Sequence, residues 1–84
     1  MLSDLPTEIG LMQNASLIDL SENLLTNEIP SELALLENLQ GLYLNGNLLS
    51  GSIPVELCDR VTNNGLDLLI DCDLVECACG CRCI

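Results

Sequence analysis

The chain has 84 residues, enough for one small domain with a thin core. The chain has thirteen acidic residues and two arginines. A surface with the resulting net charge of −11 repels phosphate backbones and anionic lipids. The absence of lysine and histidine excludes a P-loop and removes the commonest general base and metal ligand. Leucine fills 20 positions and aromatic residues only one, a composition that favours a repeating architecture.

The first eleven residues carry the end of a repeating unit. An aliphatic residue followed by proline recurs every 24 residues, as Leu5-Pro6, Ile29-Pro30 and Ile53-Pro54. We therefore expect a partial repeat at 1–11, full repeats at 12–35 and 36–59, and a degenerate repeat at 60–76. Together they predict one repeat region over residues 1–70.

Each full repeat contains a short predicted strand. Apolar residues alternate in Ile18-x-Leu20 and again in Leu42-x-Leu44, which is the period of a strand with one buried face. The Ile-Pro pair then bends the chain, because proline fixes its own φ and restrains the residue before it. A short helical or 3₁₀ turn is expected after Pro30.

The unit L-x-x-L-x-x-L-x-L-x-x-N-x-L-x-G-x-I-P-x-x-L resembles the plant-type leucine-rich repeat of receptor ectodomains and secreted inhibitors. The resemblance implies an α/β solenoid, a right-handed superhelix with a parallel β-sheet on its concave side. It also implies that the side-chain amides of Asn23 and Asn47 bond the backbone of adjacent coils. Asn27 stands where the next repeat has Gly51, and both residue types tolerate positive φ.

The third unit departs from the pattern. Leu66 and Leu68 keep the 24-residue spacing, but Asp71 falls where asparagine is expected, and no Ile-Pro pair follows. Residues 65–70 still predict a last strand. A register shifted by two, with Leu68 and Ile70 pointing inward, remains open.

Six cysteines lie in the last third of the chain, at Cys58, Cys72, Cys77, Cys79, Cys81 and Cys83. An even number in a short chain predicts disulfides formed in an oxidising compartment, with at least one bond inside the tail cluster of four if all six pair. Segment 58–84 is expected to cap the stack. It resembles the C-terminal caps of repeat proteins in diatoms and related algae. The alternating Cys-x-Cys spacing leaves a metal-binding tail as the alternative.

Candidate ligand contacts are the outward-facing residues of the predicted concave face: Asp19, Ser21, Glu22, Tyr43, Asn45 and Asp67. Tyr43 is the single aromatic residue, and tyrosine is enriched at interfaces. Asp19, Glu22 and Asp67 are expected to flank it with negative charge. A protein or peptide with a basic, partly apolar patch would suit this face.

No catalytic constellation is found in the sequence, because it has no Gly-x-Ser-x-Gly elbow and no histidine to activate a serine or cysteine. We therefore expect a non-enzymatic binding module without cofactor, metal or nucleic-acid partner. It would be the C-terminal end of a receptor-like cell-surface or secreted recognition protein. The alternative is an intracellular repeat protein with a metal-binding cysteine tail.

The cellular location follows from indirect signals. The cysteines indicate an extracellular or cell-surface location, and the sequon Asn14-Ala15-Ser16 would then carry an N-linked glycan. The sequence shows neither a signal peptide nor a membrane-spanning segment. We therefore interpret the chain as a piece of a longer protein, which would itself be secreted or membrane-anchored.

Overall fold

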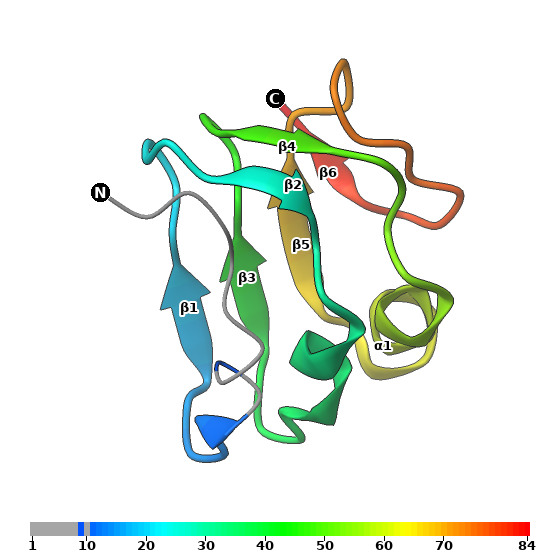
Figure 1. Cartoon of the computed structure of the whole chain (residues 1–84). Coiled ribbons are helices and arrows are strands. Elements are labelled where there is room, and N and C mark those ends of the chain that lie inside the picture. Colours follow the sequence, from blue (N-terminus) through cyan, green and yellow to red (C-terminus); the bar gives the residue numbers. More distant parts are fainter. Residues whose placement is uncertain (1–8, 10) are drawn as a thin grey trace.

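The computed structural model describes residue 9 and residues 11–84, so most of the expected partial repeat 1–11 lies outside the described residues. Pairs of strands alternate with single helices along the chain (Figure 1). Their order is β1 (Leu17–Asp19), β2 (Thr26–Glu28), the 3₁₀ helix η2 (Ser31–Leu35), β3 (Gly41–Tyr43), β4 (Leu48–Ser50), α1 (Val55–Asn64), β5 (Asp67–Ile70) and β6 (Arg82–Cys83).

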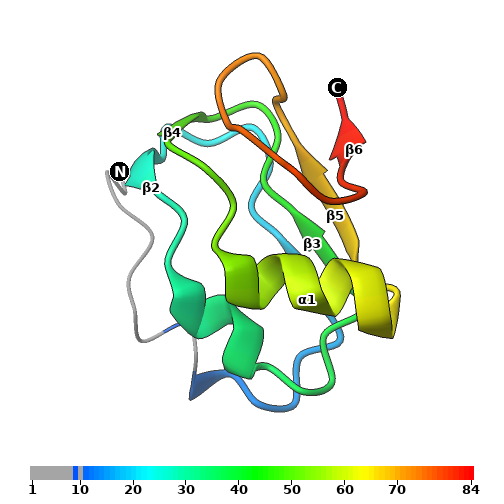
Figure 2. The same cartoon turned by 90° about the vertical axis from the view of Figure 1, so that its right-hand side faces the viewer.

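The strands form two parallel sheets. Four strands make the larger sheet in the order β1-β3-β5-β6, and β2 pairs with β4 in a smaller sheet. Figure 2 shows the larger sheet along one side of the molecule, the smaller sheet opposite, and η2 and α1 at the end between them. Parallel pairing of strands from successive units fits a repeat fold, because each turn of the chain places its strand beside the previous one.

The sequence offset between paired residues differs between the strand pairs of the larger sheet. Ile18 pairs with Leu42 at the expected offset of 24, but Leu42 pairs with Leu68, an offset of 26. The inward pair of β5 is therefore Leu68 and Ile70, which is the shifted register of the two considered. Leu66 is buried as well, just before the strand.

The two extra residues lie in the second connection, where α1 replaces η2. An α-helix rises only about 1.5 Å per residue, against about 3.3 Å for extended chain, so it takes up more residues over the same span. The helix ends at Gly65, which adopts the left-handed conformation at φ 69° that glycine tolerates. Arg60 ties this helix to the turn before it, donating from Nη1 to the carbonyl of Ala34 at 2.9 Å.

One aliphatic core fills the space between the two sheets and the helices. Its fully covered side chains come from every turn. The largest of them are Leu25, Leu33, Leu36, Leu42, Leu44, Leu57, Leu68 and Ile70. The proline-led return path places Leu33 and Leu57 at equivalent positions, 24 residues apart, where they are the buried residues of η2 and α1.

Two residues that are 24 positions apart, Asn27 within β2 and Gly51 directly after β4, have positive φ. Asn27 has φ 66° and Gly51 has φ 82°, so the expected positive φ at both positions is confirmed. At the preceding turn, Glu22 and Gly46 also share positive φ, at 58° and 75°. Residues 24 apart in the sequence therefore share unusual backbone geometry.

Asn47 is the buried polar side chain among the described residues, 5% exposed. Its Oδ1 accepts from the backbone N–H of Leu25 at 3.1 Å, and its Nδ2 donates to the carbonyls of Leu20 and Leu44, each at 3.0 Å. The amide thus joins its own turn to the one before. Asn23, which is exposed, donates instead to the carbonyls of Leu20 and Ser21 within its own turn.

The last segment extends both sheets. Strand β6 pairs in parallel with β5, and Glu76 forms a parallel bridge to Ser52 next to β4. Val75, the residue before Glu76, is buried in the core. Asp71 accepts from the N–H groups of Gly46 and Asn47, at 2.8 and 3.3 Å.

Three disulfides hold this segment in place, and the expected disulfide-rich C-terminal region is confirmed. Cys58 of α1 is bonded to Cys79, Cys72 to Cys83, and Cys77 to Cys81. One bond joins two cysteines of the tail cluster, and the other two connect that cluster to Cys58 and Cys72. The tail is therefore tied both to the helix and to the end of β5.

Candidate binding face

The outward side of the four-stranded sheet, here called the strand face, carries side chains from β1, β3, β5 and β6. Its members alternate with the buried residues of each strand. They are Leu17, Asp19, Gly41, Tyr43, Asp67, Leu69 and Arg82. The register aligns one row across the sheet, which runs from Asp19 through Tyr43 and Leu69 to Arg82.

Tyr43 belongs to a polar chain on the strand face, with Asp67 at its centre. Its hydroxyl donates to Asp67 Oδ2 at 3.3 Å, and Arg82 Nε lies 2.8 Å from Asp67 Oδ1. The carboxylate of Asp67 is therefore paired with a cation and is not the free negative flank that the sequence suggested. The Arg82 side chain remains 60% exposed, so its guanidinium is open to solvent beside the pair.

The apolar part of the strand face lies beside Tyr43. Leu17 is 56% exposed, and a Cβ placed on Gly41 would lie 2.8 Å from Leu17 Cδ1. A side chain at position 41 would thus push Leu17 away, which gives the glycine a packing role. Leu69 is half-buried on the opposite side of Tyr43. The tyrosine ring is consequently flanked by aliphatic side chains along the sheet.

Negative charge gathers at the β1 end. Asp19 Oδ1 accepts from the hydroxyl of Ser21 at 2.6 Å and from its backbone N–H at 3.0 Å. The side-chain bond from Ser21, followed by the backbone bond, lowers the pKa of Asp19 below its ordinary value of 3.8, because both bonds favour the charged form. Exposed Glu22 follows at the next turn.

Asn45 is less accessible than the sequence suggested. It is half-buried at the end of β3, where its backbone carbonyl accepts from the N–H of Glu22 at 2.9 Å. Its Oδ1 is buried and has no hydrogen-bond partner among residues 9 and 11–84. Asn45 therefore borders the strand face and does not project from it.

Two other sequence features can be placed. Asn14 lies exposed in the turn before β1, where the chain is open to modification. Within the described part of the chain, no helix combines the length and the apolarity needed to cross a membrane. Arg82 was not among the predicted contacts, because nothing in a cysteine tail signals that a strand of that tail joins the sheet.

Comparison with known families gives one result. The family model described as Leucine Rich Repeat matches residues 38–59, so a leucine-rich repeat is present there. This match covers β3, β4 and the first part of α1. No curated protein sequence matches the chain. A leucine-rich repeat suggests a protein-binding repeat module, and the three disulfides are consistent with an extracellular location.

Proposed function

We propose that this chain is a non-enzymatic module that binds a protein or peptide on its strand face. In this proposal the repeats are of the plant type and form the C-terminal end of a right-handed superhelix. The disulfide-rich segment is a terminal cap of the kind found in diatom repeat proteins. The whole belongs to a receptor-like cell-surface or secreted recognition protein, with a glycan on Asn14.

The observation that carries the proposal is the setting of Tyr43. An aromatic ring with a polar tip lies in the middle of a sheet surface, between the aliphatic side chains of Leu17 and Leu69. Interface hot spots combine such a central anchor with an apolar surround. Tyr43 is held by Asp67, so little side-chain entropy remains to be lost when a ligand covers it.

The charges on either side of Tyr43 give the ligand a direction. Asp19 and Glu22 lie towards the β1 side, whereas Arg82 lies on the β6 side. A ligand with a basic group near β1, an apolar side chain over Tyr43 and an acidic or amide group near Arg82 is complementary to this order. The sequence favoured a ligand with a basic, partly apolar patch, and Arg82 adds an acidic or amide group to that description.

A peptide array tests the proposal. The peptides carry a basic residue on one side of an aliphatic pair and an acidic residue on the other. One of the two possible orders of these charges should bind, and peptides with the opposite order should bind less. The best peptide, added to the ¹⁵N-labelled chain, should shift the amide signals of Tyr43 and Leu69. Tyr43→Ala should weaken binding by about 2 kcal/mol, as expected for a central anchor.

The control variant is Leu35→Ala, since Leu35 is 60% exposed on η2, away from the strand face. It should leave binding unchanged. Signals that shift on η2 and α1 while the strand face stays unperturbed would overturn the proposal. So would an array in which the order of the charges has no influence.

A further inference from the structure

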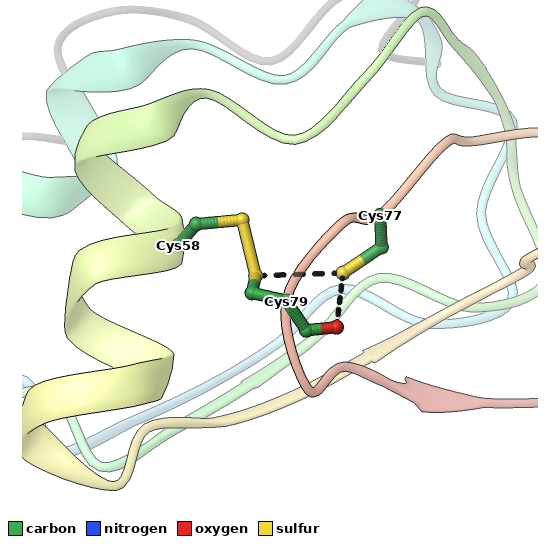
Figure 3. Close-up of side chains that lie close together, drawn as sticks. All are labelled: Cys58, Cys77 and Cys79. Atoms are coloured by element: carbon green, nitrogen blue, oxygen red, sulfur yellow. Dashed lines mark hydrogen bonds between the residues drawn. A yellow bond between two sulfur atoms is a disulfide. The ribbon is translucent and has the colours of Figure 1, made fainter.

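Three sulfur atoms from two distant parts of the chain meet in the cap. The Sγ atoms of Cys58, Cys77 and Cys79 all lie within 4.8 Å of one another. Figure 3 shows Cys58 reaching from α1 to its disulfide partner Cys79, with Cys77 directed at the same point from the neighbouring tail segment. The cluster thus depends on the fold, since Cys58 precedes the tail by nearly twenty residues.

A fourth sulfur belongs to the same group. Cys81 is bonded to Cys77, and its Sγ lies 3.9 Å from that of Cys79. The Sγ atoms of Cys77 and Cys79 are 3.5 Å apart. Two disulfides, Cys58–Cys79 and Cys77–Cys81, are therefore in direct contact, and all four cysteines are half-buried.

We propose that reduction of these two disulfides creates a tetrahedral thiolate site for a soft divalent metal ion such as Zn²⁺, formed by Cys58, Cys77, Cys79 and Cys81. A Zn–S bond of about 2.3 Å requires sulfur atoms about 3.8 Å apart in a tetrahedral site. The two non-bonded contacts already have nearly this spacing. The two bonded pairs must separate by about 2 Å each. Cys81 must also move towards Cys58, because only the Sγ atoms of Cys58, Cys77 and Cys79 all lie within 4.8 Å of one another.

The chemistry balances with a thiol or phosphine reductant. Each disulfide takes up two electrons and two protons and yields two thiols. A phosphine supplies the electrons and becomes its oxide with an oxygen from water. The four thiols then lose four protons as Zn²⁺ binds, so the affinity of the site rises with pH.

The surroundings allow access to the cluster. Cys77 lines an open surface depression with Ser52, Ile53, Glu76 and Ala78. A small reductant and a metal ion can therefore reach the sulfur atoms without unfolding of the core. Cys72 and Cys83, whose disulfide lies at the end of β5, do not belong to the cluster.

This site differs from a metal-binding linear tail. A tail site would use the alternating cysteines 77, 79, 81 and 83, whereas the folded cluster replaces Cys83 with Cys58. The distinction can be tested directly. The proposal concerns the cap alone and does not rest on ligand binding at the strand face.

The test is a Zn²⁺ titration of the full chain, kept reduced with a phosphine and followed by native mass spectrometry. The reduced chain should bind one Zn²⁺, and the oxidised chain should bind none. Cobalt in place of zinc should give the visible absorption of tetrahedral cobalt thiolate. Cys58→Ser should weaken binding by more than the ~100-fold that loss of even an outer-shell partner can cost.

Two further variants keep the test decisive. The double variant Cys72→Ser/Cys83→Ser should bind zinc as tightly as the parent chain, which a linear tail site would not. Cys58→His should retain tight binding, because imidazole is also a zinc ligand. Should the reduced chain lose its helical circular dichroism signal, zinc should restore it in the parent and in Cys58→His, but not in Cys58→Ser. Failure of the reduced parent to bind zinc, or equal binding by Cys58→Ser, would overturn the proposal.

Discussion

Each repeat forms one turn of the coiled chain. The middle turn, which contains β3 and β4, and the last turn, which contains β5, are joined to the turn before them in different ways. In the middle turn a single buried amide, Asn47, bonds to backbone groups of both turns. In the last turn the equivalent position holds Asp71, a half-buried carboxylate that accepts two backbone N–H groups. Covalent bonds add to these hydrogen bonds in the last turn, because three disulfides hold the tail in place around Asp71.

The difference follows from what lies on each side. An interior turn has a neighbour that covers its polar side chain, so a neutral amide with donors and an acceptor satisfies the buried groups at little cost. The last turn lies next to the cysteine-rich tail, and Asp71 is only half-buried there. A charged side chain is tolerated there, next to a segment that is cross-linked by three disulfides. The predictions below test this contrast.

The largest effect is expected for Asn47→Ala. The substitution leaves the Leu25 N–H and the Leu44 carbonyl buried without this partner, whereas the part-buried Leu20 carbonyl still accepts from Asn23. At about 1–3 kcal/mol for each buried group left unsatisfied, the free energy of unfolding should fall by about 4 kcal/mol. Urea unfolding followed by circular dichroism measures it. Asn23→Ala is the matched control and should cost no more than about 1 kcal/mol, because its bonds are exposed and local. Equal losses in both variants would contradict the interior role of Asn47.

The next effect concerns the link from the tail to α1. Cys58→Ser/Cys79→Ser opens a loop with a sequence separation of 21 and should lower the free energy of unfolding by about 3 kcal/mol. Cys77→Ser/Cys81→Ser opens a separation of only 4, and its expected loss is about 2 kcal/mol. Thermal unfolding of the oxidised variants ranks them. A greater loss from the variant that lacks Cys77–Cys81 would show that the long-range bond Cys58–Cys79 is not the more stabilising of the two.

A smaller effect is expected for Asp71→Ala. Hydrogen bonds to a charged group contribute about 1.5–3 kcal/mol when buried, and Asp71 is half-exposed, so a loss of about 1 kcal/mol is reasonable. Hydrogen exchange should accelerate at the amides of Gly46 and Asn47, which lose their acceptor. The neighbouring acid provides the control, since Asp73→Ala removes an exposed carboxylate and should leave both exchange rates unchanged.

The smallest effect lies in the first turn, where Asp19 accepts two hydrogen bonds from Ser21. Because the folded-state pKa of Asp19 is below 3.8, its contribution to stability is present above that pH and is lost as the pH falls through the folded value. Ser21→Ala should move the pKa back towards 3.8. Carboxyl titration by nuclear magnetic resonance measures the shift. An unchanged titration midpoint in Ser21→Ala would mean that another group lowers the pKa.

Local patterns in the sequence determined much of the repeat. The alternation of Ile18 with Leu20 and of Leu42 with Leu44 predicted strands with one buried face, and β1 and β3 are found there. The 24-residue spacing predicted their register. The positive φ of Asn27 followed from the glycine at the equivalent position. These features depend on a few neighbouring residues, and such short-range preferences can be read directly from residue type.

Only the tertiary structure decided the features that join distant segments. The offset of 26 at β5 depends on how many residues α1 takes up in place of η2, and spacing alone left two registers open. The pairing of Cys58 with Cys79 depends on where α1 lies relative to the tail. The neutralisation of Asp67 required Arg82, which reaches the strand face only because β6 joins the sheet. A repeating pattern specifies which side chains each turn buries. The contacts of the last turn with the tail depend on which groups meet once the chain is folded.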